Sequence, residues 1–246
     1  MAQVAIVTGS AAGLGQHIAV ALHKAGYNVA VTDIAEDGAK EVAASLDPSG
    51  KTAFAFKLDI SRKEDFENAL SVILDKWQAL HVVVNNAAIT PIVPIAKITP
   101  EDFDKVLSVN QRGTFLGCQV LGAHLASAGY GRIINMASLA GQNGGTAAGI
   151  HYSSSKAAII TMTKVFAREY AAHGVTVNAI APGPMDLPSV RALLSPERLA
   201  QVMDMIPVRR LGNPNFVAGI AVTLASAEAD FVTGATWDIN GGIFMR

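Results

Sequence analysis

Short apolar runs alternate with amphipathic helical stretches along the whole chain, and this alternation restricts the possible fold more than any other feature. The runs are apolar throughout instead of alternating apolar and polar residues, so both faces of each strand must be buried, as in a parallel sheet covered by crossover helices. We therefore predict an α/β fold with a doubly wound parallel sheet and helices on both faces. The runs are VAIVT, NVAVTD, AFAFKLD, HVVVNNAA, GRIINMAS, GVTVNAIAP and TWDIN.

The same pattern predicts the organisation between the strands. No internal repeat, low-complexity stretch or Pro/Gly linker divides the chain, so we expect one domain over residues 1–246. A variable segment over about 184–213 is helical in pattern, apolar on one side and rich in Met, Leu and Val, which indicates a mobile lid over a substrate. The expected helices cover roughly 13–26, 36–46, 62–78 and 101–128, and one more carries Tyr152.

Composition argues against several classes of function. The net charge is −1, with 19 basic and 20 acidic residues, so the basic excess of a nucleic-acid-binding protein is missing. No apolar run reaches the length of a membrane helix, and the strand-like start leaves no room for a signal peptide. The single Cys118, expected to be buried and inert, fits a reducing compartment. The six histidines show no metal-ligand spacing, so we expect a cytoplasmic protein without a metal, nucleic-acid or membrane partner.

The first strand-like run ends in TGSAAGLG, a glycine-rich turn that opens a helix. Such a turn directs backbone N–H groups and the positive end of the helix dipole at a ligand above the sheet, which favours a diphosphate. Gly9 permits the tight turn, and Gly13 and Gly15 allow close approach of the helix. Ser10 and Leu14 complete the predicted cofactor loop. Because glycine spacing alone is weakly specific, a turn without a ligand is the alternative.

Asp33 favours a dinucleotide at this turn. It ends the second strand-like run, near the position where an acidic side chain binds the adenosine ribose. A carboxylate accepts hydrogen bonds from the ribose hydroxyls and repels a 2′-phosphate, and GSAAG and TDIAEDG contain no Arg or Lys to receive one. The sequence therefore predicts NAD in preference to NADP. An N-cap role for Asp33 is compatible with this function.

The segment IHYSSSKAAI places Tyr152 and Lys156 four residues apart, on one face of a helix. An ordinary surface pair is one interpretation of this spacing. The other is an acid next to a charge, because an ammonium favours the phenolate and lowers a phenol pKa from about 10. The pair by itself does not decide between them.

Taken in order, TGSAAGLG, NNAA, VNQRG, NMASLAG and YSSSK resemble the motifs of the short-chain dehydrogenase/reductase family over nearly the whole chain. The resemblance implies a Rossmann-type fold, a nicotinamide cofactor and a reaction between a secondary alcohol and a ketone. It also implies a catalytic group of Ser138, Tyr152 and Lys156. Asn110 then corresponds to the residue whose backbone keeps a kink and holds a water in a proton relay.

The implied chemistry is general acid–base catalysis. Tyr152 would exchange a proton with the substrate oxygen, and Ser138 would stabilise the charge that develops on it. The remaining contacts implied by the resemblance are with the cofactor: Asp33 and Ile34 near the adenosine ribose, Asp59 and Ile60 at the adenine, Asn86, Ala87 and Ala88 beneath the cofactor, Pro182, Gly183 and the Met185 backbone at the nicotinamide amide, and Tyr152 and Lys156 at the nicotinamide ribose.

Three departures from the family pattern concern the site. Ala88 stands where glycine is usual, and Leu187 stands where threonine is frequent. Ser138 precedes Tyr152 by fourteen residues instead of the usual thirteen, so the intervening loop is one residue longer. His151, directly before Tyr152, either faces the substrate or is a simple loop or helix-start residue.

Three functions remain open at this stage. A catabolic, NAD-linked dehydrogenase of a small alcohol, sugar or hydroxyacyl compound fits better than a 3-oxoacyl-acyl-carrier-protein reductase, because Asp33 disfavours NADP. A non-catalytic NAD-sensing protein on the same fold is a more distant alternative. The resemblance also implies a homotetramer whose interfaces involve the helices around 101–128 and 152–172 and the apolar C-terminal tail.

Overall fold

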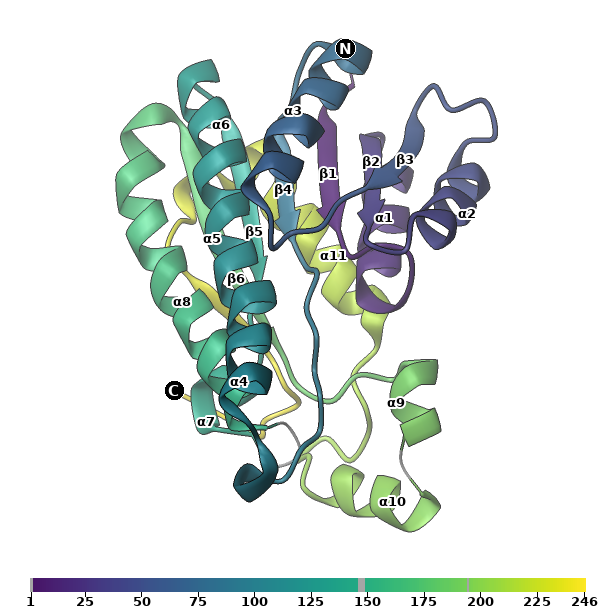
Figure 1. The fold of residues 1–246 in the computed structure, drawn as a ribbon, viewed down its shortest axis with the longest axis vertical. Coiled ribbons are helices and arrows are strands. Elements are labelled where there is room, and N and C mark those ends of the chain that lie inside the picture. The colour runs from purple at the N-terminus through teal and green to yellow at the C-terminus, as the bar shows by residue number, and fades with distance from the viewer. Residues whose placement is uncertain (1, 146–148, 194) are drawn as a thin grey trace.

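The computed structural model describes residues 2–145, 149–193 and 195–246 (Figure 1). One sheet of seven parallel strands has the order β3-β2-β1-β4-β5-β6-β7. The chain moves outward from β1 to β3 and then returns to the other side of β1, which creates a topological switch point between β1 and β4. This order confirms the predicted α/β fold with a doubly wound parallel sheet. The strands are β1 (Val4–Thr8), β2 (Asn28–Asp33), β3 (Ala53–Lys57), β4 (Val82–Asn85), β5 (Gly131–Met136), β6 (Val175–Pro182) and β7 (Thr236–Ile239).

Helices cover both faces of the sheet, as the apolar strands require. On one face lie α1 (Gly13–Lys24), α2 (Glu36–Leu46) and α11 (Pro214–Ala225). On the other face lie α3 (Lys63–Trp77), the run α4 to α6, and α8 (Ile150–Tyr170) (Figure 1). The helices that the periodicity predicts are all present, with ends that differ by at most two residues where the sequence predicts a range. The remaining short elements are α7 (Ala140–Asn143) and the 3-10 turns Ile95–Lys97, Ala171–His173 and Ala227–Phe231.

The long helix predicted over 101–128 is continuous but is interrupted twice by π-helical hydrogen bonding. It consists of α4 (Pro100–Val106), a π-helical segment (Leu107–Arg112), α5 (Gly113–Leu116), a second π-helical segment (Gly117–Leu121) and α6 (Gly122–Ala128). The helix begins with a capping box in which Thr99 and Asp102 satisfy each other's backbone N–H groups. Irregular π-helical turns often occur at functional sites, and the first one here contains Asn110.

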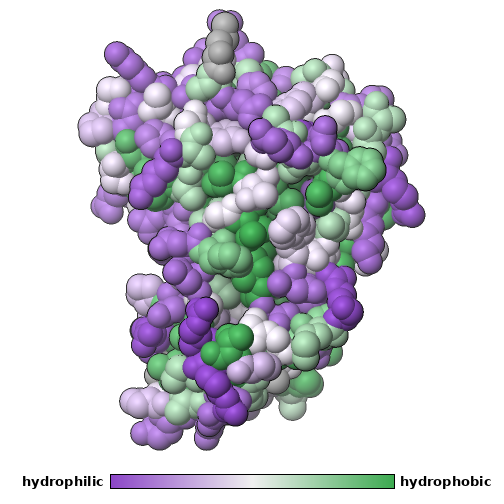
Figure 2. Space-filling model, turned by 180° about the vertical axis from the view of Figure 1, so that it is seen from behind, coloured by the Kyte–Doolittle hydropathy of each residue, from purple (hydrophilic) through white to green (hydrophobic). Residues whose placement is uncertain are grey.

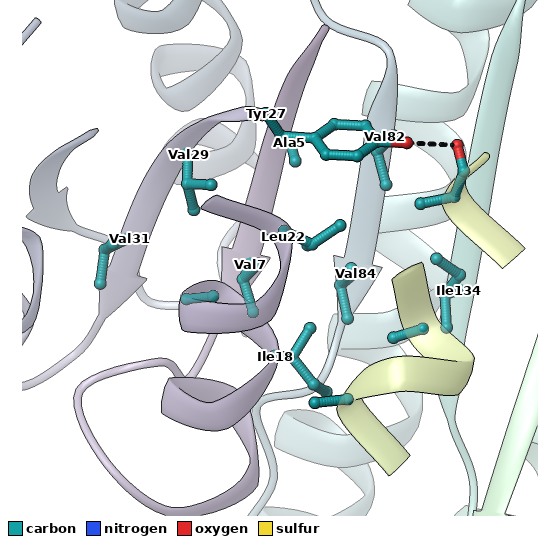
Figure 3. Packing of buried hydrophobic residues seen from close by; sticks show 14 of the residues in the cluster. Ala5, Val7, Ile18, Leu22, Tyr27, Val29, Val31, Val82, Val84 and Ile134 are labelled. Carbon is teal, nitrogen blue, oxygen red and sulfur yellow. Dashed lines mark hydrogen bonds between the residues drawn. The ribbon is translucent and has the colours of Figure 1, made fainter. Parts of the chain in front are cut away.

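The core on the α1 face shows why the chain adopts this arrangement (Figure 3). Val7 pairs in register with Val31 on one side and Val84 on the other, and all three side chains are buried. Ile18 and Leu22, one turn apart on α1, pack onto these valines. Burial of such side chains contributes roughly 1.5–3 kcal/mol each relative to exposure. Where this layer meets α11, the Tyr27 hydroxyl donates a hydrogen bond of 3.0 Å to the Ala225 carbonyl.

The segment over 184–213, predicted as a lid, leaves the sheet after β6, and its two ends are hydrogen-bonded to each other. Its two helices, α9 (Pro188–Leu193) and α10 (Pro196–Asp204), lie at the bottom of the molecule in Figure 1. Met185 and Gly212 form an isolated parallel bridge, in which Asp186 N–H donates to the Gly212 carbonyl at 2.8 Å. Seen from behind, apolar surface gathers in a hollow between this end and the body of the sheet (Figure 2).

Cys118 lies fully buried on the α3 and α8 side of the sheet. Its thiol donates to Asn135 Oδ1 at 3.4 Å, and burial raises the pKa of this thiol to about 12. A thiol with so high a pKa is unreactive at neutral pH, which confirms the prediction of an inert cysteine. No helix in the described part of the chain is both long and apolar enough to cross a membrane.

Two glycine substitutions distinguish packing from helix propensity. Gly15→Ala should lower the free energy of unfolding by about 1–3 kcal/mol, because the added methyl would overlap the Gly9 carbonyl. Gly219→Ala, on the exposed side of α11, should raise it by about 0.5–1 kcal/mol, because the methyl meets no described atom within 4 Å and Ala favours helix. Urea denaturation of both variants measures the two shifts. Equal stability of the two variants would contradict the close approach at Gly15.

Candidate active site

The predicted site residues meet at one edge of the sheet because parallel strands end on the same side. β1 leads into the glycine turn, β2 ends at Asp33, and β4 leads into Asn86. β5 is followed by Ser138, and β6 ends at Pro182. The switch point between β1 and β4 lies at the centre of this edge. Residues far apart in the sequence are therefore brought together by the topology.

The turn after β1 is held tightly against the loop after β4. Gly9 has a φ of 64°, and a Cβ there would lie 2.6 Å from Ala87 Cα. Asn86 Nδ2 donates to the carbonyls of Thr8 and Gly9, each at 2.9 Å. Asn86 and Ala87, predicted to lie beneath the cofactor, therefore shape the turn itself.

The turn fits an anionic ligand at the start of α1. Gly13 has a φ of 58°, and a Cβ there would meet no described atom within 4 Å, so space lies open beside it. In the described structure, α1 has neither a side-chain cap nor an acidic residue in its first turn. Its N-terminal N–H groups and dipole are thus available to a diphosphate, as a dinucleotide would supply.

Two residues of the predicted cofactor set also hold this turn in place. The buried Ser10 hydroxyl donates to the Val7 carbonyl at 2.8 Å and accepts from Thr32 N–H at 3.0 Å. The Ser10 side chain is therefore occupied within the fold, and its backbone N–H donates to the Thr32 carbonyl at 3.0 Å. Cofactor binding by Ser10 stays a prediction. Asp33 accepts from Ala11 N–H at 3.1 Å through one oxygen and from Ala35 N–H at 3.0 Å through the other. Each carboxylate oxygen keeps a lone pair for a ribose hydroxyl.

The residues predicted to lie near the adenosine occupy different environments. The Ile34 side chain is 63% exposed directly after β2 and offers apolar surface to a ligand. Ile60 is buried, and a Cβ on Gly113 would come within 2.6 Å of its Cδ1. Partial burial raises the pKa of Asp59, but hydrogen bonds from Ser61 offset this and leave the pKa below its usual value. Asp59 is therefore held as a rigid carboxylate.

The three residues predicted to be catalytic lie together at the end of β5. Tyr152 and Lys156 stand one turn apart on α8, with the Lys156 ammonium 5.7 Å from the centre of the Tyr152 ring. Lys156 Nζ donates to the carbonyl of Met136, the last residue of β5, at 2.6 Å. The hydroxyls of Ser138 and Thr90 lie near the phenol and lower its pKa in part. The phenol therefore faces two hydroxyl groups, and the ammonium is anchored to the sheet.

Burial changes the proton affinities of this group, and one prediction needs correction. Burial raises the pKa of Tyr152 above its usual value, although hydrogen bonding with Ser138 and Thr90 lowers it in part. The net shift of the Tyr152 pKa is thus opposite to the lowering expected from Lys156, because desolvation is the largest effect and the ammonium is directed to Met136. Burial also lowers the pKa of Lys156, to about 8. Desolvation disfavours the charged form of each group, so the two shifts have opposite signs.

Asn110 joins the site to the long helix. It is fully buried in the first π-helical segment, and its side chain exchanges two hydrogen bonds with the Ile89 backbone, at 2.8 and 2.9 Å. Its amide also donates to Ser155 Oγ at 3.2 Å. The helix irregularity predicted at Asn110 is present as a π-helical segment. Through these contacts Asn110 holds the loop after β4, and hence Thr90, against α8.

The loop predicted to meet the nicotinamide amide follows β6. Gly183 N–H donates to the Ile239 carbonyl at 2.8 Å, and a Cβ on Gly183 would come within 2.9 Å of Asn240 Cα. The Met185 side chain is buried beside Gly212, which leaves its backbone for ligand contact. Leu187 packs against the core and supplies no hydroxyl, in contrast to a threonine at that position.

The comparisons with known proteins agree with this geometry. A family model described as enoyl-(acyl carrier protein) reductase matches residues 9–243. Sorbitol dehydrogenase of Cereibacter sphaeroides is 34% identical and covers 99% of this chain and 98% of its own. Acetoacetyl-CoA reductase of Rhizobium meliloti is 38% identical over the whole of both chains. A 3-oxoacyl-acyl-carrier-protein reductase of Vibrio cholerae is 34% identical over 99% of this chain and 98% of its own.

This chain belongs to the short-chain dehydrogenase/reductase family. The relatives are oxidoreductases that act on hydroxyl or keto groups, and members of the family use nicotinamide cofactors. The predicted family and reaction type are therefore confirmed. In the described parts of this short-chain dehydrogenase/reductase, no three His, Cys, Asp or Glu residues come together as a metal ion would require.

Sequence reasoning missed one residue of the site and left another undecided. Thr90 was not singled out, although it lies two residues after the NNAA motif, beyond the end of β4. A hydroxyl residue just beyond a strand end at the switch point was the signal that could have identified it. His151 lies in the first turn of α8, at the helix-start position that was one of the alternatives, and its side chain is fully buried.

The direction in which the pKa of Tyr152 is shifted can be measured in the protein without cofactor. We expect the Tyr152 phenol to titrate above its usual value of about 10, because burial disfavours the phenolate. NMR titration of ring-labelled tyrosine would follow each phenol, and the signal lost in Tyr152→Phe identifies the resonance among the four tyrosines. A midpoint below 10 would show that Lys156 dominates even without cofactor.

Proposed function

We propose that this short-chain dehydrogenase/reductase is an NAD-linked cytoplasmic dehydrogenase that interconverts a small secondary alcohol, sugar or hydroxyacyl compound with the corresponding ketone. The observation that carries the proposal is the meeting of Ser138 and Tyr152, with Lys156 one turn away, at the sheet edge that also carries the glycine turn. An acid, a hydrogen-bond donor and an anion-binding turn together suit hydride chemistry at a carbonyl. The similarity to sorbitol dehydrogenase and acetoacetyl-CoA reductase supports substrates of these two kinds.

The side chains of this group have distinct roles in the proposed mechanism. Ser138 donates a hydrogen bond to the substrate oxygen and stabilises the charge that develops there. Tyr152, kept protonated by its raised pKa, donates its phenolic proton to that oxygen during reduction and accepts it during oxidation. A bound nicotinamide cofactor supplies or accepts the hydride. Lys156 contributes charge beside the phenol and binds the ribose next to the nicotinamide.

The cofactor would be held by the elements that shape the site. The glycine turn and the start of α1 receive the diphosphate, and Asp33 receives the adenosine ribose. Pro182, Gly183 and the Met185 backbone would contact the nicotinamide amide, with Ala88 lining the groove. Since Asp33 presents a carboxylate where a 2′-phosphate would lie, NAD is the proposed cofactor.

A second candidate function is reduction of a 3-oxoacyl group on an acyl carrier protein. The similarity to such reductases over nearly the whole chain favours it. Asp33 counts against it, because a carboxylate disfavours NADP, the usual cofactor of that reduction. A non-catalytic NAD-sensing role is disfavoured because a sensor has no use for Ser138 and Tyr152 around one substrate position.

A homotetramer remains part of the proposal. Several apolar side chains are exposed on the long helix, on α8, on α11 and near the C-terminus, where a single copy leaves them to water. Phe115 is 37%, Val165 50% and Phe216 59% exposed, while Phe231 is completely exposed. Contact with further copies would bury these side chains.

Replacement of Asp33 tests the cofactor assignment. The unmodified protein should bind NADH more tightly than NADPH, and Asp33→Asn should narrow the ratio of dissociation constants about tenfold by removing the charge. Calorimetric titration measures both constants, and Asp37→Asn is the matched control because Asp37 is fully exposed on α2. Tighter binding of NADPH than NADH by the unmodified protein would contradict the assignment.

Replacement of Tyr152 tests the mechanism. Tyr152→Phe keeps the ring but removes the transferable proton, so turnover should fall about 10²- to 10⁴-fold with little change in NADH affinity. Ser138→Ala should reduce mainly turnover, and Lys156→Ala should reduce both turnover and cofactor affinity, without additivity among the three. Steady-state assays with a panel of alcohols and ketones, with Tyr130→Phe as control, measure these effects. Near-normal turnover of Tyr152→Phe while chemistry is rate-limiting would refute the mechanism.

A further inference from the structure

A cavity of about 420 Å³ opens beside the proposed catalytic group. It lies between the segment that follows β4, the first turns of α4 and the start of α8. Thr90 lines this cavity, and its hydroxyl lies near enough to the Tyr152 phenol to lower its pKa. His151, the residue before Tyr152, lines it from α8. The cavity therefore neighbours the proposed catalytic group through Thr90 and His151, while Tyr152 and Ser138 do not themselves line it.

His151 has one ring nitrogen in use and one free. Its Nδ1 lies 2.9 Å from the backbone nitrogen of Tyr152 and accepts that N–H, one of the donors left without a partner at the start of α8. An Nδ1 that accepts places the hydrogen of a neutral imidazole on Nε2. The His151 side chain is thus a helix cap at one nitrogen and a donor at the other.

The Nε2–H donor of His151 is buried without a protein partner. The side chain is 0% exposed, and among the described residues no group forms a hydrogen bond with Nε2. A buried donor without a partner is unfavourable, and such groups are rare in native proteins. The hydrogen bond at Nδ1 does not satisfy this second donor. A ligand oxygen in the cavity would satisfy the donor.

The walls of the cavity indicate the chemistry of that ligand. Ile89, Val93 and Val106 supply apolar surface. The two charged lining residues, Asp102 and Lys105, have opposite signs and lie exposed on α4, so together they favour neither an anion nor a cation. A neutral group that carries one oxygen acceptor fits this combination.

We propose that the cavity is a substrate subsite in which His151 Nε2–H donates to an uncharged hydroxyl or carbonyl oxygen near the reacting carbon. The subsite rests on the proposed function and refines its substrate class: polyols, hydroxyketones and similar molecules with a second oxygen are preferred over simple secondary alcohols. Thr90 forms the wall shared by the subsite and the phenol. Because a site built to pair with an oxygen discriminates against molecules that lack it, His151 is a specificity-determining residue.

Two substitutions separate the two nitrogens. In His151→Asn, the side-chain oxygen takes the place of Nδ1 and keeps the cap, but the Nε2–H donor is lost. In His151→Gln, the amide nitrogen takes the place of Nε2 and keeps the donor, but the cap is lost. His173→Asn, at an exposed 3-10 turn, is the control. Thermal unfolding of each variant monitors the structural effect separately from activity.

The substrates form a matched pair that differs by one oxygen, 2,3-butanediol and 2-butanol, with acetoin and 2-butanone for the reverse reaction. We expect His151→Asn to lower kcat/KM for the diol about tenfold, mainly through KM, and to leave the value for 2-butanol unchanged. His151→Gln should retain the preference for the diol even where its unfolding temperature is lower. The ¹⁵N shift of His151 Nε2 should move when the diol is added to the protein with NADH.

The outcomes separate the subsite from the function on which it rests. Inactivity of the unmodified protein on both pairs and on a panel of sugars and hydroxyacyl compounds contradicts the proposed function, and the Nε2 shift then decides the subsite independently. Equal losses for diol and 2-butanol in His151→Asn would overturn the subsite and assign His151 a purely structural role. Unchanged diol kinetics together with an unmoved Nε2 shift would overturn it as well, and would indicate that the cavity holds only water.

Discussion

The close contact between the turn after β1 and the loop after β4 is the constraint on which the rest of the site depends. Gly9 adopts a positive φ against Ala87, Gly15 lies against the Gly9 carbonyl, and Asn86 bonds two carbonyls of the turn. These contacts cross the switch point of the sheet, so they set the distance between the anion-binding end of α1 and the loop that carries Thr90. The contacts at Gly9 and Gly15 require the absence of a side chain, and the contact at Asn86 requires an amide in a defined orientation.

Burial at this edge has two consequences for the chemistry of the site. It raises the pKa of Tyr152 and lowers that of Lys156, because both charged forms lose water. The protein without cofactor therefore holds an acid in its protonated form beside an amine whose pKa burial lowers to about 8. Asn110 stabilises the geometry by joining Ile89 to α8 through three hydrogen bonds. The positions of the Tyr152 acid and of the subsite beside it thus depend on the same three hydrogen bonds of Asn110.

The fold could be predicted in detail because its signals are local. Mainly apolar runs predicted every strand, although the edge strands β3 and β7 are only partly buried. Periodicity predicted the main helices, since each pattern reports burial of one element against its neighbours. The grouping of Ser138, Tyr152 and Lys156 could be predicted from the family resemblance, because the motifs that carry these residues can be read directly from the sequence. The roles of Ser10, Thr90 and His151 could not be predicted in the same way. They depend on which backbone group or cavity each side chain meets across the fold, and sequence spacing does not encode these contacts.

By itself, the sequence determined the parallel α/β sheet, the family and the identity of the residues at the carboxyl edge, because strand burial and short motifs are properties of neighbouring residues. Only the tertiary structure decided how those residues share their hydrogen bonds. It directed Lys156 to Met136, occupied the Ser10 hydroxyl, and left His151 Nε2 buried without a described partner in a residue that lines a cavity. The physical reason is desolvation: whether a polar group keeps, exchanges or lacks a partner depends on the chain segments that fold over it and exclude water.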